Sequence, residues 1–566
     1  MEREMGESKM FDSSCLSLIL LTLQQIFFLK KHNLYFLPIL TGLMLALAWF
    51  PHGWLPLLFI AFIPLMAVEY IVFHNPDKYK GRTVYFSAFI AFFIWNLLTT
   101  WWLVNASWGG AIIAIGLNSF LMSLVFLFFH KIKKRVGEKW GYLVFISIWI
   151  TFEFVYHGDQ ITWPWLTLGN AFADTTSIVQ WYEYTGVFGG SLWVLVINCI
   201  FFSCLTESFT RKKFISAIAL IILPIGISIL LLFSSSPTSE TELHKIVIVQ
   251  PNIDPYNEKF SGTYEHQLQK MLDLALEKTD STTEYVVLPE TALVEDIWED
   301  ELEQSSSIIT IRKFLEKYPK LKIIIGASTA KAFKPGEALS ETARKFYKSE
   351  NYYDAYNTAF HFENSEAIQK YHKSKLVPGV EQMPLQFIFK YFEQFALEMG
   401  GTTGSLGFQS TRTVFSSTDS EVKFAPVICY ESVYGEYVTE YVKNGANVIS
   451  VITNDGWWGN SPGHIQHLKL SKLRAIENRR WVVRSANTGI SCFISPQGVV
   501  SQATEYWVPA SIAGTVELNN EFTFYTRFGD YIGRIAMYLA FMLIIYSWLI
   551  RFRIIKTSNF MNDNLK

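Results

Sequence analysis

The sequence predicts two parts that fold in different solvents: an α-helical transmembrane bundle of about eight spans and an α/β layered domain outside the cytoplasm. Residues 84–130 contain no Asp, Glu, Lys or Arg. Such a segment is typical of membrane spans, which need about 20 predominantly apolar residues each. Residues 235–532 instead show apolar runs of four to six residues between helical patterns. Strands that alternate with helices indicate an α/β layered domain.

Seven of the predicted spans precede residue 235, and one follows the α/β domain. They lie at about 34–50, 54–73, 84–104, 110–130, 140–157, 190–207, 214–234 and 533–550. The chain is therefore divided into four regions: a lead-in, a seven-span domain, an outer domain, and a last span with a tail, at 1–33, 34–234, 235–532 and 533–566. Residues 15–29 are apolar but short, so we interpret them as an interfacial lead-in and leave open whether they span the membrane.

The charges of the loops predict the orientation of the bundle. Lys and Arg gather in every second loop, at 78–82, 131–139 and 211–213, and again after the last span. The loops between them contain neither residue. Because cytoplasmic loops carry the excess of Lys and Arg, the outer domain is predicted to lie outside the cytoplasm.

The composition excludes several classes of protein. Half of the 566 residues are hydrophobic and 17% are charged, which excludes disorder for most of the chain. The 48 basic and 50 acidic residues nearly cancel, so a basic field for nucleic acid is absent. Five cysteines, an odd and small number, do not indicate a disulfide framework.

Three predicted strands of the outer domain end in residues that can carry chemistry. The strand at 285–288 runs into Glu290, the strand at 425–428 into Cys429, and the strand at 447–452 into the motif NDGWWG at 454–459. Reactive groups tend to collect just past the carboxyl ends of strands in such sheets. A further stretch, 371–381, supplies Lys373 and Glu381.

Glu290, Lys373 and Cys429 together can provide a base, an electrostatic clamp and a nucleophile. A free thiol has a pKa of roughly 8.5, so it needs a base to become a thiolate near neutral pH. A partly desolvated carboxylate can be that base. An ammonium group can stabilise a developing oxyanion.

Structural roles compete with these catalytic ones. Cys429 alone could be a buried structural thiol, and Glu290 could cap a turn after Pro289. Glu381 and Glu431 could be partners in structural ion pairs. Trp457 could be a core ring rather than the wall of a pocket.

The order Glu, Lys, Cys, carried by PET at 289–291, by YHKSKLVPGVE at 371–381 and by ICYE at 428–431, resembles the nitrilase superfamily of carbon–nitrogen hydrolases. The runs NDGWWG at 454–459 and RAIENRRWVVRSANTG at 474–489 are similar as well. Seven spans, a nitrilase-like domain and one more span resemble the apolipoprotein N-acyltransferase family of bacteria. The resemblance implies an αββα sandwich for the outer domain.

The resemblance also implies roles for single residues. Glu290 matches the family's general base, Lys373 its catalytic lysine and Cys429 its acyl-accepting nucleophile. Supporting or substrate-binding positions match Glu381, Tyr430, Glu431, Asn454 and Trp457. The family has a tryptophan after the strand that here ends in QPNI at 250–253, where the comparable aromatic is Phe260, so an indole donor is replaced by an apolar wall.

The implied activity is transfer of a fatty acyl chain from a membrane phospholipid to the α-amino group of diacylglyceryl-cysteine in an apolipoprotein, through a thioester on the cysteine. It needs no cofactor, because the phospholipid ester supplies the acyl group. The implied location is the bacterial inner membrane, with the catalytic domain on the periplasmic side. The oligomeric state stays open.

Two other functions compete with acyl transfer. One is a membrane-anchored nitrilase-type amidase, which uses the same three residues with water as the acceptor. The other is a polytopic transporter or scaffold with an inert outer domain. His464 and His467 lie at i and i+3, but no cysteine or second carboxylate cluster completes a ligand set, so no metal site is predicted.

Overall fold

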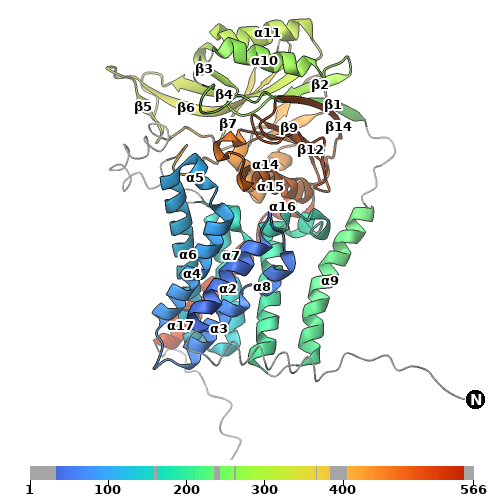
Figure 1. Cartoon of the computed structure of the whole chain (residues 1–566). Coiled ribbons are helices and arrows are strands. Elements are labelled where there is room, and N and C mark those ends of the chain that lie inside the picture. The colour runs from blue at the N-terminus through green and yellow to red at the C-terminus, as the bar shows by residue number, and fades with distance from the viewer. Residues whose placement is uncertain are drawn as a thin grey trace, which may run out of the picture.

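The computed structural model describes residues 33–158, 162–207, 210–234, 242–259, 263–364, 366–382 and 405–552. A bundle of roughly parallel and antiparallel helices forms one end of the molecule, and a layered α/β domain is stacked on the other (Figure 1). The predicted fold class is therefore confirmed. The lead-in at 15–29 lies outside the described residues, and the predicted domain boundaries stay predictions.

The helices of the bundle follow the predicted spans. They are α2 (Asn33–Ala48), α3 (Ile63–His74), α4 (Gly81–Thr100), α5 (Leu103–Ala106), α6 (Trp108–Val136), α7 (Gly141–Tyr156), α8 (Tyr182–Thr206), α9 (Arg211–Ser234) and α17 (Tyr531–Arg551). Counting the 3₁₀ turn Leu55–Phe59 with α3, six helices within the described ranges are long and apolar enough to cross a membrane. Helices α2 and α7 have 16 residues each.

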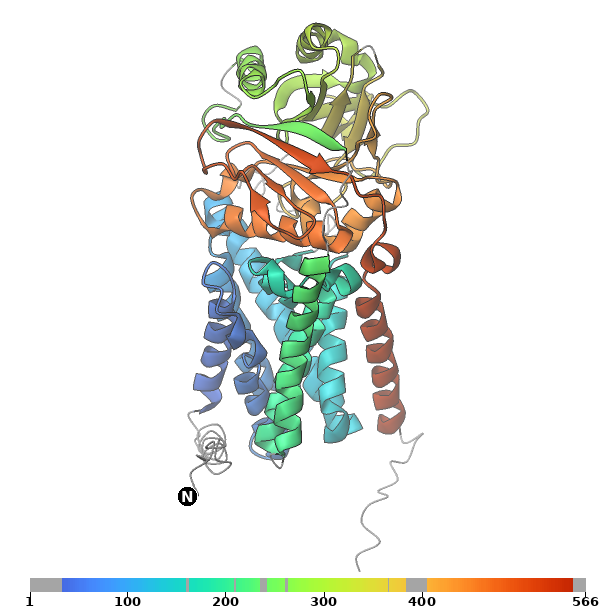
Figure 2. The same ribbon diagram turned by 90° about the vertical axis from the view of Figure 1, so that its right-hand side faces the viewer.

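Helix α8 begins at Tyr182, before the predicted span at 190–207, and it is kinked at Gly186. The backbone there has φ +59°, a left-handed conformation that glycine adopts readily. A Cβ at this position would lie 2.2 Å from the Tyr525 ring, so the close approach also requires glycine. Helix α9 stands at the edge of the bundle and is largely exposed (Figure 2).

Two sheets form the centre of the outer domain. The first has the order β14-β1-β2-β4-β6-β5, with β3 paired to β4 and β7 to β6, and the second has the order β13-β12-β11-β10-β9-β8. The first contains β1 (Leu243–Gln250), β2 (Thr283–Val287), β3 (Leu293–Trp298), β4 (Lys322–Ala332), β5 (Arg344–Lys345), β6 (Tyr352–Phe362), β7 (Gln369–His372) and β14 (Ala510–Glu517). The second contains β8 (Phe415–Ser416), β9 (Lys423–Ile428), β10 (Val448–Thr453), β11 (Trp481–Ala486), β12 (Cys492–Ile494) and β13 (Val500–Ser501).

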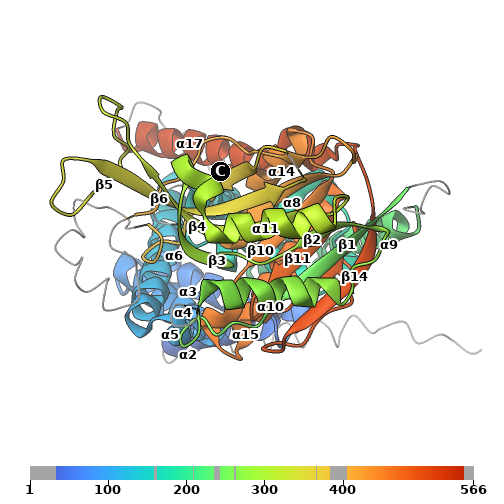
Figure 3. The same cartoon turned by 90° about the horizontal axis from the view of Figure 1, so that it is seen from above.

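Helices cover both outer faces of this sandwich. Helices α10 (Tyr264–Leu276) and α11 (Ser306–Lys317) run side by side over the first sheet (Figure 3). Their apolar faces pack on one side of β1, β2 and β4, while the other side of these strands faces the second sheet. Helices α14 (Gly435–Lys443), α15 (Pro462–Asn478) and α16 (Phe524–Phe528) lie between the second sheet and the bundle (Figure 1).

Helix α15 joins the outer domain to the bundle through a buried glutamine. Gln466 Oε1 accepts hydrogen bonds from the indole N–H groups of Trp102, at 3.1 Å, and Trp165, at 2.7 Å. Its amide donates to the carbonyl oxygens of Phe50 and Thr99, at 3.3 and 3.1 Å. One hydrophobic cluster continues from the inter-sheet core through α15 into the bundle. The two halves therefore form one packed body.

We predict that Gln466→Leu destabilises this junction. The change leaves the buried indole N–H of Trp165 without its acceptor, and an unsatisfied buried donor costs about 1–3 kcal/mol. Thermal unfolding of the detergent-solubilised protein should show a lower Tm. Gln269→Leu is the matched control, because Gln269 is exposed on α10 and its amide bonds the nearby Asp273 of the same helix. Equal Tm values for the two variants would contradict the assigned role of Gln466.

Candidate active site

The sheet topology brings two of the predicted residues to one edge of the first sheet. Strand β4 is parallel to β2 and antiparallel to β6, and β6 is antiparallel to β7. Strands β2 and β7 are therefore parallel, and their carboxyl ends meet at the same edge. Glu290 follows β2, Lys373 follows β7, and Cys429 follows β9 of the facing sheet.

Lys373 lies between two carboxylates in the interior of the site. Its Nζ is 3.0 Å from Glu290 Oε1 and 2.8 Å from Glu381 Oε1. Asn357 of β6 donates from Nδ2 to both carboxylates, at 2.8 and 3.1 Å. The backbone N–H of Asn454 donates to Glu290 Oε2 at 3.1 Å. Glu290 and Lys373 are both buried, so their charges are paired rather than solvated.

These contacts fix the charge states of the pair. Burial alone would raise the pKa of Glu290, but the Lys373 ammonium and the hydrogen bonds from Asn357 and Lys373 hold it below its ordinary value. Burial opposes the charge of Lys373, yet Glu290 and Glu381 raise the pKa of that ammonium well above its ordinary value. The site therefore holds an ionised carboxylate and a protonated lysine at neutral pH.

Cys429 is half-buried and its backbone is strained. Its φ is +51°, in the left-handed region that non-glycine residues rarely adopt, and such strain is concentrated at functional sites. Burial raises the pKa of the thiol well above its ordinary value, the Glu290 charge raises it further, and the Lys373 charge opposes both. The thiol is therefore protonated at rest, within the electrostatic influence of the ionised Glu290 carboxylate.

Glu431 ties the Lys373 loop to the Cys429 turn. Its carboxylate accepts hydrogen bonds from the hydroxyls of Tyr371 and Tyr437, both at 2.6 Å, and from the backbone N–H of Ser374 at 2.7 Å. The other oxygen accepts from the backbone N–H of Ile428 at 2.8 Å. Glu431 thus holds the backbone on both sides of the site.

The other predicted supporting residues lie in different places. The Tyr430 hydroxyl donates to the Thr162 carbonyl oxygen of the bundle at 3.0 Å. Trp457 is half-buried and packs edge-on against Tyr256, with ring centroids 5.1 Å apart. Asn454 contributes its backbone N–H to Glu290, as described above. Phe260 lies outside the described residues.

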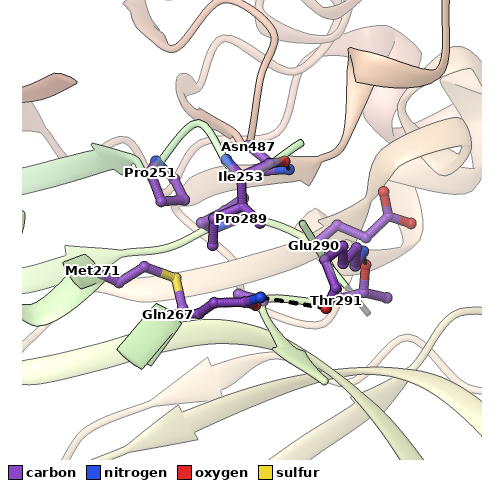
Figure 4. A pocket seen from close by; sticks show the side chains of 10 residues that line it. Pro251, Ile253, Gln267, Met271, Pro289, Glu290, Thr291 and Asn487 are labelled. Carbon is purple, nitrogen blue, oxygen red and sulfur yellow. Dashed lines mark hydrogen bonds between the residues drawn. The ribbon is translucent and has the colours of Figure 1, made fainter. Parts of the chain in front are cut away.

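Sequence reasoning missed a second lysine beside Glu290. Lys259 is buried, and its Nζ donates to the hydroxyl of Thr291. It lines a cavity with Pro289, Glu290 and Thr291, while the Glu290 carboxylate points away from this cavity (Figure 4). Burial lowers the pKa of Lys259 to about 8, although the charge of Glu290 opposes the shift. In the sequence, its position directly before Phe260 could have indicated that Lys259 lies near the site.

Two further positions were also missed. Asn357 bridges both carboxylates, but in the sequence it is an ordinary polar residue within a strand. Gly326 of β4 lets the Glu290 turn approach closely, because a Cβ there would lie 2.6 Å from Glu290 Cα and 2.5 Å from the Thr291 nitrogen. A glycine inside the apolar run at 323–327 indicates such an approach.

Two family models match the two parts of the chain. The carbon–nitrogen hydrolase model matches residues 245–519, which defines the class of the outer domain. The model of the apolipoprotein N-acyltransferase N-terminal domain matches residues 41–200 in the bundle. The chain belongs to the apolipoprotein N-acyltransferase family.

Relatives match over most of the length of the chain. An apolipoprotein N-acyltransferase of Chlorobaculum tepidum is 29% identical, over 90% of this chain and 95% of the relative. One from Haemophilus influenzae is 26% identical, over 85% and 88%. Among solved structures, a member of branch 10 of the nitrilase superfamily from Saccharomyces cerevisiae aligns with a TM-score of 0.35 and 17% identity, over 50% of this chain and 93% of that one.

We predict that Asn357→Leu raises the pKa of Glu290. The variant removes a hydrogen bond to the ionised carboxylate, and a bond of this kind is worth about 1–2 pKa units. The rate of Cys429 alkylation by iodoacetamide, followed by peptide mass spectrometry, should then fall off at a higher pH on the acid side. The sign follows because a base with a raised pKa stays protonated to higher pH. Asn351→Leu, in an exposed turn, is the control, and an unshifted acid limb in Asn357→Leu would contradict the prediction.

Proposed function

We propose that this chain transfers a fatty acyl group from a membrane phospholipid to the N-terminal α-amino group of diacylglyceryl-cysteine in apolipoproteins. Family membership supports the acyltransferase activity. The phospholipid donor and the roles of Glu290, Lys373 and Cys429 are part of the proposal. The observation that carries it is a buried Glu290–Lys373 pair whose charges act on the thiol of Cys429.

The position of the site favours a lipid substrate. Tyr430, the residue after the nucleophile, bonds Thr162 of the bundle. Near Glu290, the Tyr256 hydroxyl donates to the Asn105 carbonyl oxygen at 3.3 Å, and the Asn105 amide donates to the Trp458 carbonyl oxygen at 2.7 Å. The turns that follow β9 and β10 thus contact the bundle, which supports access of a membrane lipid to the proposed catalytic residues.

The first half-reaction acylates the enzyme. Glu290 accepts the proton of the Cys429 thiol, and the sulfur attacks the ester carbonyl carbon of the phospholipid. The Lys373 ammonium has three N–H donors, two of which point at Glu290 and Glu381, and the third stabilises the oxyanion. The ester C–O bond then breaks, and the lysophospholipid oxygen takes the proton from Glu290. A thioester remains on Cys429.

The second half-reaction passes the acyl group to the acceptor. The α-amine of the diacylated apolipoprotein attacks the thioester carbonyl and gives a proton to Glu290. The C–S bond breaks, the sulfur takes that proton back, and an amide is formed. The two substrates therefore react in turn, and ping-pong kinetics follow.

The alternative of a membrane-anchored amidase uses the same three residues with water as the acceptor. The contacts of Tyr430 and Trp458 with the bundle favour a lipid acceptor over water. A transporter or scaffold would leave the buried Glu290–Lys373 pair and the neighbouring Cys429 without a role, and family membership in the acyltransferases argues against it. The catalytic domain is proposed to lie on the periplasmic side of the bacterial inner membrane, as the basic loops indicate.

We predict a long-chain acyl adduct on Cys429 when the purified protein is incubated with phospholipid alone. Intact-mass measurement should show one acyl group, which hydroxylamine removes because thioesters react with it. Cys429→Ala should carry no adduct. Cys492→Ala is the matched control and should still be acylated, since Cys492 is buried in β12.

Absence of the adduct, together with steady release of ammonia from small amides, would favour the amidase and contradict acyl transfer. Adding a diacylated lipopeptide with a free amine should discharge the thioester in the wild type. The same lipopeptide with an acetylated amine should leave it in place.

We predict that the outer domain is reached from the periplasm. Tyr347 is 87% exposed in the arm between β5 and β6, so Tyr347→Cys should react with a membrane-impermeant maleimide in intact spheroplasts. Lys78→Cys, in a basic loop at the other end of the bundle, should react only after permeabilisation. The reverse pattern would overturn the proposed orientation.

A further inference from the structure

A histidine that takes no part in the proposed chemistry contacts the backbone of the nucleophile. His467 lies on α15 and is fully buried. Its Nε2 is 3.1 Å from the carbonyl oxygen of Cys429 and 3.0 Å from Ser432 Oγ. Ser432 Oγ donates to the same carbonyl oxygen at 2.7 Å. The Cys429 carbonyl is therefore held from two sides.

The other ring nitrogen of His467 faces a carboxylate. Nδ1 is 2.9 Å from Asp455 Oδ1, and Asp455 Oδ2 pairs with Arg484 Nη2 at 2.5 Å. Burial alone would raise the pKa of Asp455, but the Arg484 and His467 charges hold it well below its ordinary value. Asp455 is ionised, so Oδ1 can only accept a hydrogen bond from His467.

Both ring nitrogens of His467 thus face oxygens that accept. A carbonyl oxygen and a carboxylate oxygen have no proton to give, and a neutral imidazole has only one N–H. The single hydroxyl proton of Ser432 already points at the Cys429 carbonyl. Arg484 Nη2 is 3.3 Å from Nδ1, but its short contact is with Asp455. A doubly protonated ring satisfies all of these contacts.

We propose that His467, as an imidazolium held by Asp455, is a positioning residue that donates to the Cys429 carbonyl and keeps the nucleophile in its left-handed conformation. A φ of +51° costs roughly 1–3 kcal/mol in a residue with a Cβ, so it persists only where neighbours enforce it. The carbonyl fixes the orientation of the peptide plane, and with it the direction of the Cys429 side chain.

The groups that face His467 support a buried cation there. Asp455 carries the negative charge, and Arg484 on β11 carries a positive charge that Asp455 already neutralises. The rings of Trp165 and Trp458 close the remaining sides, with centroids 5.9 and 5.6 Å from the imidazole. Asp455, Arg484 and Cys429 are the titratable or charged residues that contact the ring within the described chain.

The protonation state can be measured directly. In ¹⁵N-histidine-labelled protein, the signals lost in His467→Gln identify the His467 ring, and at pH 7 they should show the shifts of an imidazolium. A ring with one unprotonated nitrogen would overturn the proposal. This measurement does not depend on turnover, so it remains decisive even if the proposed function fails.

The positioning role is measured by acylation kinetics and rests on Cys429 being the acyl-accepting nucleophile. His467→Phe keeps a ring but no donor, so the rate of thioester formation should fall about ten- to a hundredfold, the range for loss of a hydrogen bond to a charged group, with KM for phospholipid unchanged. His467→Gln keeps one donor and should recover part of the rate. His464→Phe is the matched control, because His464 is buried on the same helix and stacks on Tyr506.

Three results would count against the positioning role. They are an unchanged rate in His467→Phe, a KM increase that accounts for the whole loss, or the same loss in His464→Phe. A fall in Tm equal to that of His464→Phe, with the rate loss confined to His467 variants, supports positioning over general stability. A wild type that forms no thioester would instead contradict the proposed function, and the histidine spectrum would then test this proposal alone.

Discussion

A buried ammonium between two carboxylates determines the organisation of the outer domain's site. Lys373 is 1% exposed, and Glu290 and Glu381 lie within 3.0 Å of its Nζ. Buried charges of this kind are stable only when they are paired and hydrogen-bonded. The loops after β2 and β7 must therefore meet at fixed positions. The backbone bond from Lys373 N–H to the Asn357 carbonyl at 2.8 Å fixes one side of this arrangement.

Cys429 is fixed by a different set of contacts. Glu431 binds the backbone of both the Lys373 loop and the Cys429 turn. It therefore fixes the position of the two sheets relative to each other at the site. His467 of helix α15 contacts the Cys429 carbonyl in the same turn. The neighbouring Gln466 bonds the bundle at the Phe50 carbonyl. The charge pair and the thiol thus come from separate sheets that two buried networks hold together.

The sequence predicts the parts of this structure that depend on local patterns. The spans follow from apolar length, and Glu290, Lys373 and Cys429 follow from strand ends and from motif order. Gln466 and Asn357 could not be found in this way, since their partners lie far away in the chain and each residue looks ordinary among its neighbours. Tyr430 shows the converse, because its place in a motif does not reveal that its hydroxyl reaches Thr162.

Two consecutive residues of α15 bind the helical bundle and the Cys429 turn. Gln466 binds the tryptophans of the bundle, and His467 binds the Cys429 carbonyl. A rotation or slide of α15 that disturbs one contact must move the other, because the helix is rigid over a single residue step. Removal of the bundle would leave Gln466 without its tryptophan partners, one residue away from the contact of His467 with Cys429. The membrane-spanning half thus helps to fix the conformation of the Cys429 turn through α15, in addition to anchoring the outer domain.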